Sequence, residues 1–368
     1  MTGNPLLEPV YRFIRNQQLI LILLAVLTGS AAAFGAIVFR EAVDLIQLAT
    51  FGASLEQMSG FIDELPDWKI VLVPTAGGLF VGLLVHYLMP GRRNRGVADV
   101  MEAAALRSGS ITLREGLGAA SVSAISIGVG ASVGREGPVV HLGATLSSFV
   151  ATRLRLSRSQ AVTLLGCGVA SAVASSFNAP IAGVFFALEV VIGHYALSAF
   201  APIVIAGVTG TIITRLYFGD FPAFIIPDQT IVSFWEFPAF ALLGVVCAMS
   251  AVIFLRSVEF SSDVFGRIPV PGWLKPMFGG LCVGVIALAF PQVLGVGYEA
   301  TDLALKGQYG LALLIALIAA KTAATAICVG AGFGGGVFTP SMFIGAMVGG
   351  AFGLVATEFF PHLSSGHS

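Results

Sequence analysis

Charged side chains are scarce in this sequence, and their scarcity decides its broad class. Only 11% of the 368 residues are Asp, Glu, Lys or Arg, whereas 56% are hydrophobic and the mean hydropathy is +0.92. Soluble domains carry about 25% charged residues, so this composition predicts an integral membrane protein. The formal net charge is −1, which argues against a bulk electrostatic partner such as nucleic acid.

Metal-binding and catalytic patterns are missing as well. The four cysteines lie within apolar runs, and neither they nor the five histidines show the spacing of a metal site or a disulfide framework. The sequence has no HExxH pattern and no Ser/His pairing that would favour an intramembrane enzyme. We therefore expect neither a cofactor nor enzymatic activity. The apolar run from Leu19 to Val38 is too long for a cleavable signal peptide, so we expect it to stay as a membrane span.

Long apolar runs predict an all-α chain whose helices cross the membrane. About 20 apolar residues suffice to cross a bilayer, and the sequence offers such runs near 19–48, 69–89, 198–218, 237–257, 276–290 and 309–329. Shorter helices are expected at 97–107, 138–154 and 181–192. Basic residues cluster at the N-terminus and at 92–95, while acidic ones gather between 50 and 68. The positive-inside rule then predicts a cytoplasmic N-terminus, in a plasma or bacterial inner membrane.

One stretch places two charges inside a glycine-rich apolar segment. Arg135 and Glu136 lie in the run from Ile127 to Gly143. A charge at membrane depth costs roughly 3 kcal/mol or more and therefore marks a cavity or a pathway. Glycine lets a ligand approach the backbone closely, and Pro138 suits the first turn of a helix. We predict an irregular turn and a helix N-terminus that favours an anion, with Glu136 as its protonatable substitute.

The second half of the chain shows the same pattern. Gly330 to Pro340 is again a glycine-rich turn before an apolar helix. Interrupted apolar segments in both halves indicate an inverted-repeat transporter with its site near the membrane midplane. We predict a bundle of tilted, broken and re-entrant helices, with repeats at 1–218 and 219–368, in which the turns at 134–138 and 336–340 meet.

Three stretches, taken in order, resemble the CLC family of chloride channels and chloride–proton antiporters. Gly134-Arg-Glu-Gly-Pro138 matches the family's GREGP motif, and Gly336-Val-Phe-Thr-Pro340 matches its GxFxP motif. Phe177-Asn-Ala-Pro-Ile-Ala-Gly183, followed by Phe186-Ala-Leu-Glu189, matches the region between them. The resemblance covers most of the chain and implies a homodimer with one anion pathway per subunit.

The resemblance also assigns roles to single residues. It implies that Glu136 is the gating glutamate, which competes with the anion and accepts protons from outside. It places the backbone N–H groups of Val337 and Phe338 at the central anion site, and the backbone around Arg135 and Gly137 at the outer site. Backbone dipoles can hold a weakly hydrated anion without trapping it.

The inner anion contact departs from the family pattern. The family's GSGIP motif aligns with Asn94-Arg-Gly-Val-Ala98, so Arg95, beside Gly96, stands where the family has an anion-contacting serine. In one interpretation Arg95 belongs to a cytoplasmic basic run and points to water. In the other it lines the inner mouth of the pathway and raises the local anion concentration.

Proton coupling is the second departure. Antiporters of the family carry an internal acid directly after the position of Glu189, where this sequence has Val190. We predict anion transport, with chloride as the substrate, by a passive channel or a weakly proton-coupled antiporter. The alternatives are strict chloride/proton exchange and an organic-solute transporter of another inverted-repeat fold. A further charge, Lys321, is expected to pair with a carboxylate, to snorkel, or to line the pathway.

The chain after Phe338 is much shorter than the stretch from Glu136 to Phe218. We therefore expect the second repeat to be incomplete, without the family's last helices and without its CBS domains. The missing helices would carry the tyrosine that contacts the central anion. Neither Tyr298 nor Tyr309 matches that position.

Overall fold

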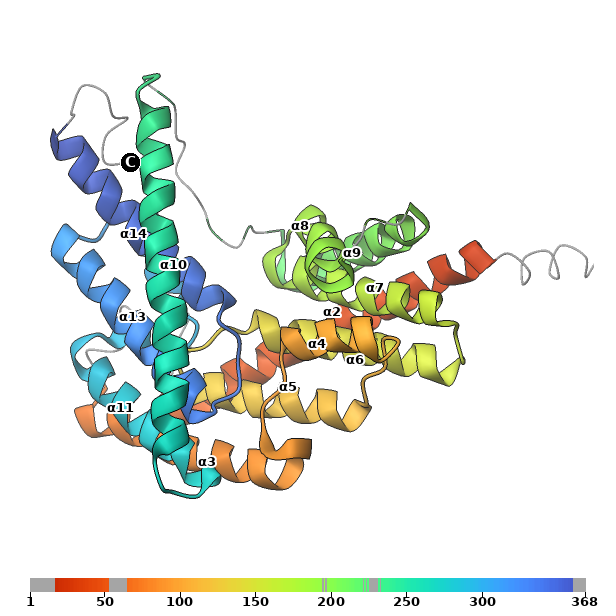
Figure 1. Cartoon of the computed structure of the whole chain (residues 1–368), viewed down its shortest axis with the longest axis horizontal. Helices are drawn as coiled ribbons and strands as arrows, with labels where there is room; N and C mark the ends of the chain where they lie inside the picture. Colours follow the sequence, from red (N-terminus) through yellow and green to blue (C-terminus); the bar gives the residue numbers. More distant parts are fainter. Residues whose placement is uncertain are drawn as a thin grey trace, which may run out of the picture. The chain divides into compact units, whose positions relative to one another are not determined.

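The computed structural model describes residues 17–52, 65–193, 195, 197–220, 222, 224, 231 and 233–359 (Figure 1). Within these residues the chain is all-helical, as predicted. Its first half contains α2 (Gln17–Phe51), α3 (Asp67–Leu88), α4 (Val97–Leu106), α5 (Leu113–Gly128), α6 (Glu136–Arg153), α7 (Arg158–Phe177), α8 (Pro180–Phe186) and α9 (Leu197–Phe218). Its second half contains α10 (Glu236–Arg267), α11 (Lys275–Ala289), α12 (Tyr298–Leu305), α13 (Leu311–Ala331) and α14 (Phe338–Phe359).

Eight of the helices in the described residues are long and apolar enough to span a membrane, which agrees with the predicted class. Most expected boundaries hold to within a few residues. One exception is α10, which continues to Arg267, about ten residues past the expected end of its apolar run. Its charged last part stays helical, and Arg256 pairs there with Glu259 one turn later at 3.3 Å. Much of the expected 50–68 loop, residues 53–64, lies outside the described residues.

The helix after the first glycine turn begins slightly earlier than expected. We expected Pro138 to open it, but α6 starts at Glu136. Proline is tolerated there because the amides of a first helical turn have no partner within the helix. The carboxylate of Glu136 is therefore carried by the helix end itself.

The chain divides into two compact units, each built from separate segments. The first comprises residues 1–40, 95–120 and 138–223, and the second comprises 41–94, 121–137 and 224–368. The boundary runs within α2, α5 and the first turn of α6. The repeat boundary expected at residue 218 concerns the symmetry of the chain rather than these units, and it stays a prediction.

In the first unit, α7 packs against α8 and α9 (Figure 1). Small residues bring these helices together closely. A Cβ on Gly143 of α6 would lie 2.5 Å from the carbonyl oxygen of Gly168 of α7. The hydroxyl of Ser171 donates to the carbonyl of Gly29 of α2 at 2.6 Å. Close backbone approach through small residues is typical of helices packed inside membranes.

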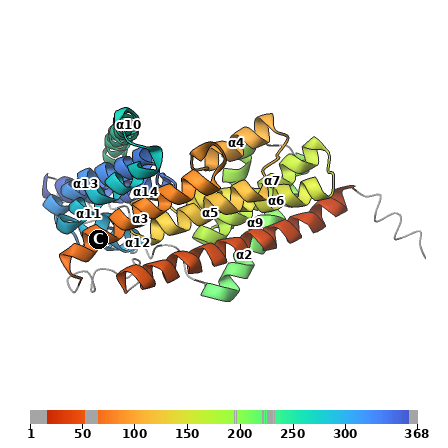
Figure 2. The same cartoon turned by 90° about the horizontal axis from the view of Figure 1, so that it is seen from below.

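In the second unit, α3 packs along α11, and α13 packs against α10 and α14 (Figure 2). Each helix carries a small-xxx-small pattern at the contact. Gly78 and Gly82 of α3 lie against Pro276 and Trp273, and Gly280 and Gly284 of α11 lie against Pro74 and Val71. A Cβ on Gly82 would lie 2.0 Å from the carbonyl oxygen of Trp273, and one on Gly280 would lie 2.0 Å from that of Pro74. A Cβ on Gly77 of α3 would lie 2.5 Å from Val129, and one on Gly78 would lie 2.9 Å from Phe333, so α3 also packs against the residues beside both glycine turns.

Candidate functional site

The two glycine turns meet within the second unit. Gly134 and Gly336 exchange two backbone hydrogen bonds, with N···O distances of 2.6 and 2.8 Å, as an isolated antiparallel bridge. Gly335 adopts a φ of 153°, and a Cβ there would lie 2.3 Å from the side chain of Val133. Only glycine fits this crossing. The prediction that the turns at 134–138 and 336–340 lie together is confirmed.

Two helix starts share this place. One is α6, which begins at Glu136, and the other is α14, which begins at Phe338. The N-terminal end of a helix carries partial positive charge, so two such ends together favour a negative group. Val337 and Phe338 are accessible, with exposed fractions of 38% and 51%. The arrangement therefore suits an anion or a carboxylate.

The carboxylate that occupies the meeting point belongs to Glu136, which is only 4% exposed. The phenolic O–H of Tyr298 donates to its Oε1 at 2.7 Å, and the hydroxyl of Thr339 donates to its Oε2. Arg135 Nε lies 3.9 Å from the same Oε1. Both hydroxyls are good donors to a carboxylate, so this geometry holds the Glu136 side chain in place.

Tyr298 is the first residue of α12, and its ring is held by two neighbours. The guanidinium carbon of Arg135 lies 4.4 Å from the centre of the ring, and the ring of Phe224 stacks on it at 5.4 Å between centroids. A guanidinium over an aromatic face is attractive and orients both groups. Arg135 therefore acts on Glu136 by its charge and by holding the tyrosine that contacts it.

Side chains and backbone groups of the same unit satisfy the irregular backbone around the site. Gly334 N–H donates to the hydroxyl of Ser126 at 2.9 Å, and Ser132 N–H donates to Cys328 Sγ at 3.2 Å. Gly295 N–H donates to the carbonyl of Gly130 at 3.2 Å. Non-helical backbone at membrane depth is tolerated only where the protein supplies such partners. The backbone N–H groups of the turns are thus paired with groups of the same unit rather than with water.

Sequence reasoning missed two residues of this site. From the sequence alone, Tyr298 is compared only with the family's central tyrosine, and Thr339 is named only within the GxFxP motif. Each carried a signal, because Tyr298 directly follows the glycine break at 295–297 and Thr339 lies inside the matched turn. Both lie far along the chain from Glu136, 162 and 203 positions away. No local pattern reports a contact over that separation.

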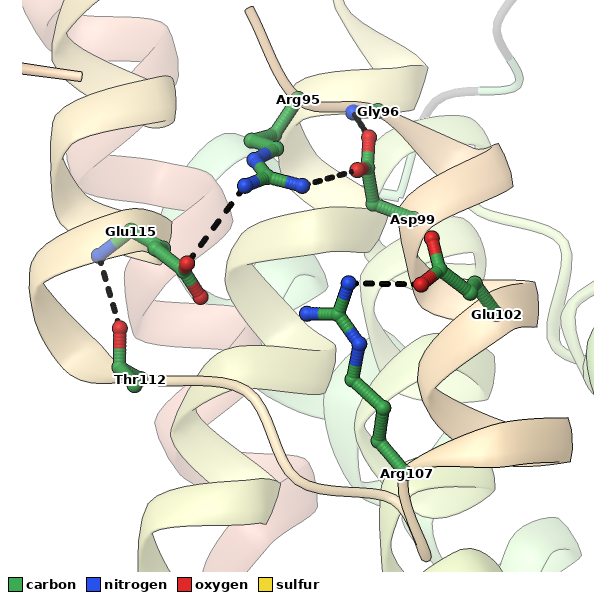
Figure 3. A network of polar contacts seen from close by, with 7 residues as sticks. All are labelled: Arg95, Gly96, Asp99, Glu102, Arg107, Thr112 and Glu115. Carbon is green, nitrogen blue, oxygen red and sulfur yellow. Dashed lines mark hydrogen bonds and ion pairs between the residues drawn. The ribbon is translucent and has the colours of Figure 1, made fainter. Parts of the chain in front are cut away.

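Arg95 and Gly96 lie in the first unit, within a polar network at the starts of α4 and α5 (Figure 3). Arg95 Nη1 is 2.6 Å from Asp99 Oδ1, and its Nη2 is 3.6 Å from Glu115 Oε1. The amide of Gly96 donates to Asp99 Oδ2 at 3.0 Å. Asp99 therefore caps α4 and neutralises Arg95 at the same time.

The interpretation in which Arg95 points to water is wrong, because its side chain is only 11% exposed and lies between two carboxylates. The Gly96 amide already holds an anionic group, the carboxylate of Asp99. Whether Arg95 and Gly96 also act on a transported anion stays a prediction.

Replacing Arg95 by glutamine should destabilise the protein by about 1–3 kcal/mol, because it leaves two partly buried carboxylates without their cation. The measurement is the thermal unfolding of purified protein in detergent. Arg92→Gln is the matched control, since Arg92 is exposed in the same basic run. An unchanged unfolding temperature, together with lower anion flux at low ionic strength, would favour the inner-mouth role instead.

Comparisons with known proteins agree with this geometry. The family model described as "Voltage gated chloride channel" matches residues 77–368. A putative chloride channel protein ClcB-like from Ralstonia nicotianae is 34% identical over 337 residues, covering 90% of this chain and 78% of the relative. An H(+)/Cl(-) exchange transporter ClcA from Vibrio cholerae is 27% identical and covers 93% of this chain and 74% of the relative. The chain spans about half the length of two related plant proteins.

The fold has a close match among solved structures. The structure of a slow cyanobacterial Cl-/H+ antiporter superposes with a TM-score of 0.80, at 21% identity, over 93% of this chain and 81% of that one. The family match extends over most of the chain and includes both glycine turns. This chain therefore belongs to the voltage-gated chloride channel family, the CLC family, as its three motifs predicted.

Proposed function

We propose that this protein moves chloride across a membrane, with Glu136 as the gate of the pathway and no bound cofactor. The observation that carries the proposal is the buried carboxylate of Glu136, which lies where two helix starts meet and accepts hydrogen bonds from Tyr298 and Thr339. A place that stabilises a carboxylate through dipoles and hydroxyl donors also suits a halide. The function is transport rather than catalysis.

The gate works by competition between two negative groups. While Glu136 is ionised, it fills the position that an anion would take. Protonation removes its charge and weakens both hydroxyl contacts, because a neutral carboxyl is a poorer acceptor. Chloride can then bind among the backbone amides around Arg135, Gly137, Val337 and Phe338. Amide dipoles bind it without a full opposing charge, so the anion can leave again.

The same competition allows either passive conduction or exchange against protons. We propose a passive channel or a weakly coupled antiporter, because Val190 cannot carry a proton. Val190 is 39% exposed on the π-helical turn Ala187–Ile192 that follows α8. Its neighbour Glu189 accepts a hydrogen bond from Tyr195 at 3.3 Å, which is a structural contact. Strict exchange is the alternative, favoured by the relative named as an exchange transporter.

Placing glutamate at position 190 should raise the proton flux that accompanies chloride flux by several-fold, because it adds a titratable group where the antiporters of the family have one. Val190→Gln, of similar size but not titratable, is the matched control. Equal proton flux in both variants would show that Val190 does not limit coupling.

The proposal is tested by flux from proteoliposomes, with a chloride electrode and a pH electrode recording together. Chloride release that depends on the protein supports transport, and simultaneous proton uptake against a gradient separates exchange from passive conduction. Fluoride and nitrate in place of chloride rank the anions. Liposomes that retain chloride with the protein incorporated in either orientation would contradict the proposal.

We further propose a homodimer with one pathway per subunit, in a plasma or bacterial inner membrane with its N-terminus in the cytoplasm. The dimer rests on family membership, and the orientation rests on the basic residues near the N-terminus and at 92–95. Cross-linking in native membranes tests the first, and protease access to an N-terminal tag tests the second.

A further inference from the structure

Lys321 is a buried basic residue of the second unit. It has no role in the gate proposed above. It lies in the middle of α13 and has no exposed surface. Its Nζ donates to the carbonyl oxygens of Val293 at 3.1 Å and Gly295 at 3.0 Å, and lies 5.0 Å from the centre of the Phe343 ring. No carboxylate in the described part of the chain pairs with it. The expectations that it pairs with an acid or snorkels to water are both wrong.

A buried ammonium without a counter-ion is an expensive feature, and at membrane depth such a group points to a function. Both acceptors of Lys321 belong to one short segment, residues 291–297, which connects α11 to α12. This segment is mostly buried and continues from the 3-10 turn Pro291–Val293 into non-helical backbone, where the lysine satisfies the carbonyls of Val293 and Gly295. Lys321 therefore fixes the conformation of the segment.

The segment ends at Tyr298, the residue that holds Glu136. Gly297 precedes it with a φ of 87° and caps α12. A Cβ at Gly297 would lie 2.8 Å from the Phe343 ring and 3.2 Å from Lys321 Nζ, so the backbone before Tyr298 passes directly over the lysine and the phenylalanine. The position of the Tyr298 hydroxyl is thus set from α13 and α14 through backbone contacts.

We propose that Lys321 is a positioning residue for the gate: it holds the 293–297 backbone so that the Tyr298 hydroxyl latches the ionised carboxylate of Glu136. The proposal rests on the gate role of Glu136 proposed above. Among the described residues of this unit, the groups that face Glu136 are Tyr298, Thr339 and Arg135, and Lys321 acts on it through the first of these.

The latch has a definite effect on the pH dependence of flux. Donation from Tyr298 stabilises the closed gate in its deprotonated form, so it moves opening to more acid pH. Without this hydrogen bond, a lower proton concentration suffices to open the gate, and the midpoint pH of chloride flux rises. A hydrogen bond to a charged acceptor corresponds to a shift of about one pH unit or somewhat more.

The test is a double-mutant cycle on the midpoint pH of chloride flux in proteoliposomes. Tyr298→Phe and Lys321→Met should each raise the midpoint by about one pH unit, and the double variant should show no more than Tyr298→Phe alone. Lys321→Gln keeps N–H donors for the two carbonyls and should retain more of the wild-type midpoint than Lys321→Met. If Lys321→Met does not fold, Lys321→Ala, which also removes the donor but leaves room for water at the two carbonyls, replaces it in the same cycle.

Two controls separate this effect from general damage. Lys306→Met removes an exposed lysine of the segment after α12, where it pairs with Asp302, and should leave the midpoint unchanged. Tyr309→Phe removes a second phenol of the same unit with the same expectation. A midpoint that does not move in Tyr298→Phe, or a Lys321 shift that persists in the Tyr298→Phe background, would overturn the proposal. Glu136→Gln distinguishes a failure of the Lys321 proposal from a failure of the gate proposal. If chloride flux through this variant still depends on pH, Glu136 is not the gate.

Discussion

Chloride flux through the Glu136→Gln variant should lose its dependence on pH between acid and neutral conditions. Glutamine has nearly the shape of glutamate but cannot take up or release the proton. It also lacks the charge that the Tyr298 and Thr339 hydroxyls stabilise in the closed position. A loss of about 1.4 kcal/mol of closed-state stability corresponds to a tenfold change in the equilibrium between the closed and the open gate. Chloride flux at neutral pH should therefore rise by about tenfold.

The measurement is initial chloride efflux from proteoliposomes over a series of symmetric pH values. Glu259→Gln is the matched control, because Glu259 is an exposed carboxylate of the same unit. Anion binding, followed by calorimetry with chloride, should persist in Glu136→Gln since the backbone amides remain. A variant that still responds to pH like the wild type would remove Glu136 from the gate.

The Gly280→Ala variant should be much less stable than the wild type. A Cβ on Gly280 would lie 2.0 Å from the carbonyl oxygen of Pro74 and 2.6 Å from its carbonyl carbon. Both are backbone atoms of α3, so no side-chain rotation relieves the clash and the two helices must separate. Overpacking of this kind costs about 1–3 kcal/mol, and more where the neighbour cannot move.

Thermal unfolding in detergent, and the yield of monodisperse protein, check this expectation. Gly244→Ala on α10 is the matched control, because a Cβ there meets nothing within 4 Å. Alanine is a better helix former than glycine by about 1 kcal/mol, so the control should be neutral or slightly stabilising. Equal unfolding temperatures for the two variants would mean that α3 and α11 are packed less closely than described.

The spans could be predicted from the sequence because their cause is local, whereas the meeting of the distant turns at Gly134 and Gly336 followed from the repeated motif and the inverted-repeat pattern. Apolar runs of sufficient length form helices in a membrane. A glycine-rich turn that ends in proline interrupts them in each half, at Gly134 to Pro138 and at Gly336 to Pro340. The end of α10 was missed because its last charged turns have no apolar signal, although the helix continues through them and carries the exposed ion pair Arg256–Glu259. The length of an apolar run predicts the part of a helix that lies in the membrane, but not the residue at which the helix ends.

The hydroxyl contacts and the role of Lys321 could not be predicted, for a different reason. Tyr298 reaches Glu136 from another segment, and the acceptors of Lys321 are backbone carbonyls, which every residue possesses. Sequence shows that a charge is buried but not which dipoles compensate it. For Arg95 the sequence showed a basic run, whereas Asp99 and Glu115 turn that arginine into a structural ion pair.

The second unit is assembled from three separate stretches of the chain, and its bridge joins Gly134 to Gly336. During synthesis, the ribosome must therefore deliver the chain as far as Thr339 before Glu136 can contact both of its hydroxyl donors. Until then the charges of Arg135 and Glu136 lack their partners from the second half of the chain, while the nascent chain is already entering the membrane. Such long-range closure is slow and leaves the intermediate open to capture by chaperones or proteases. Biogenesis, and not only transport, then depends on how quickly the segments that carry Tyr298 and Thr339 emerge.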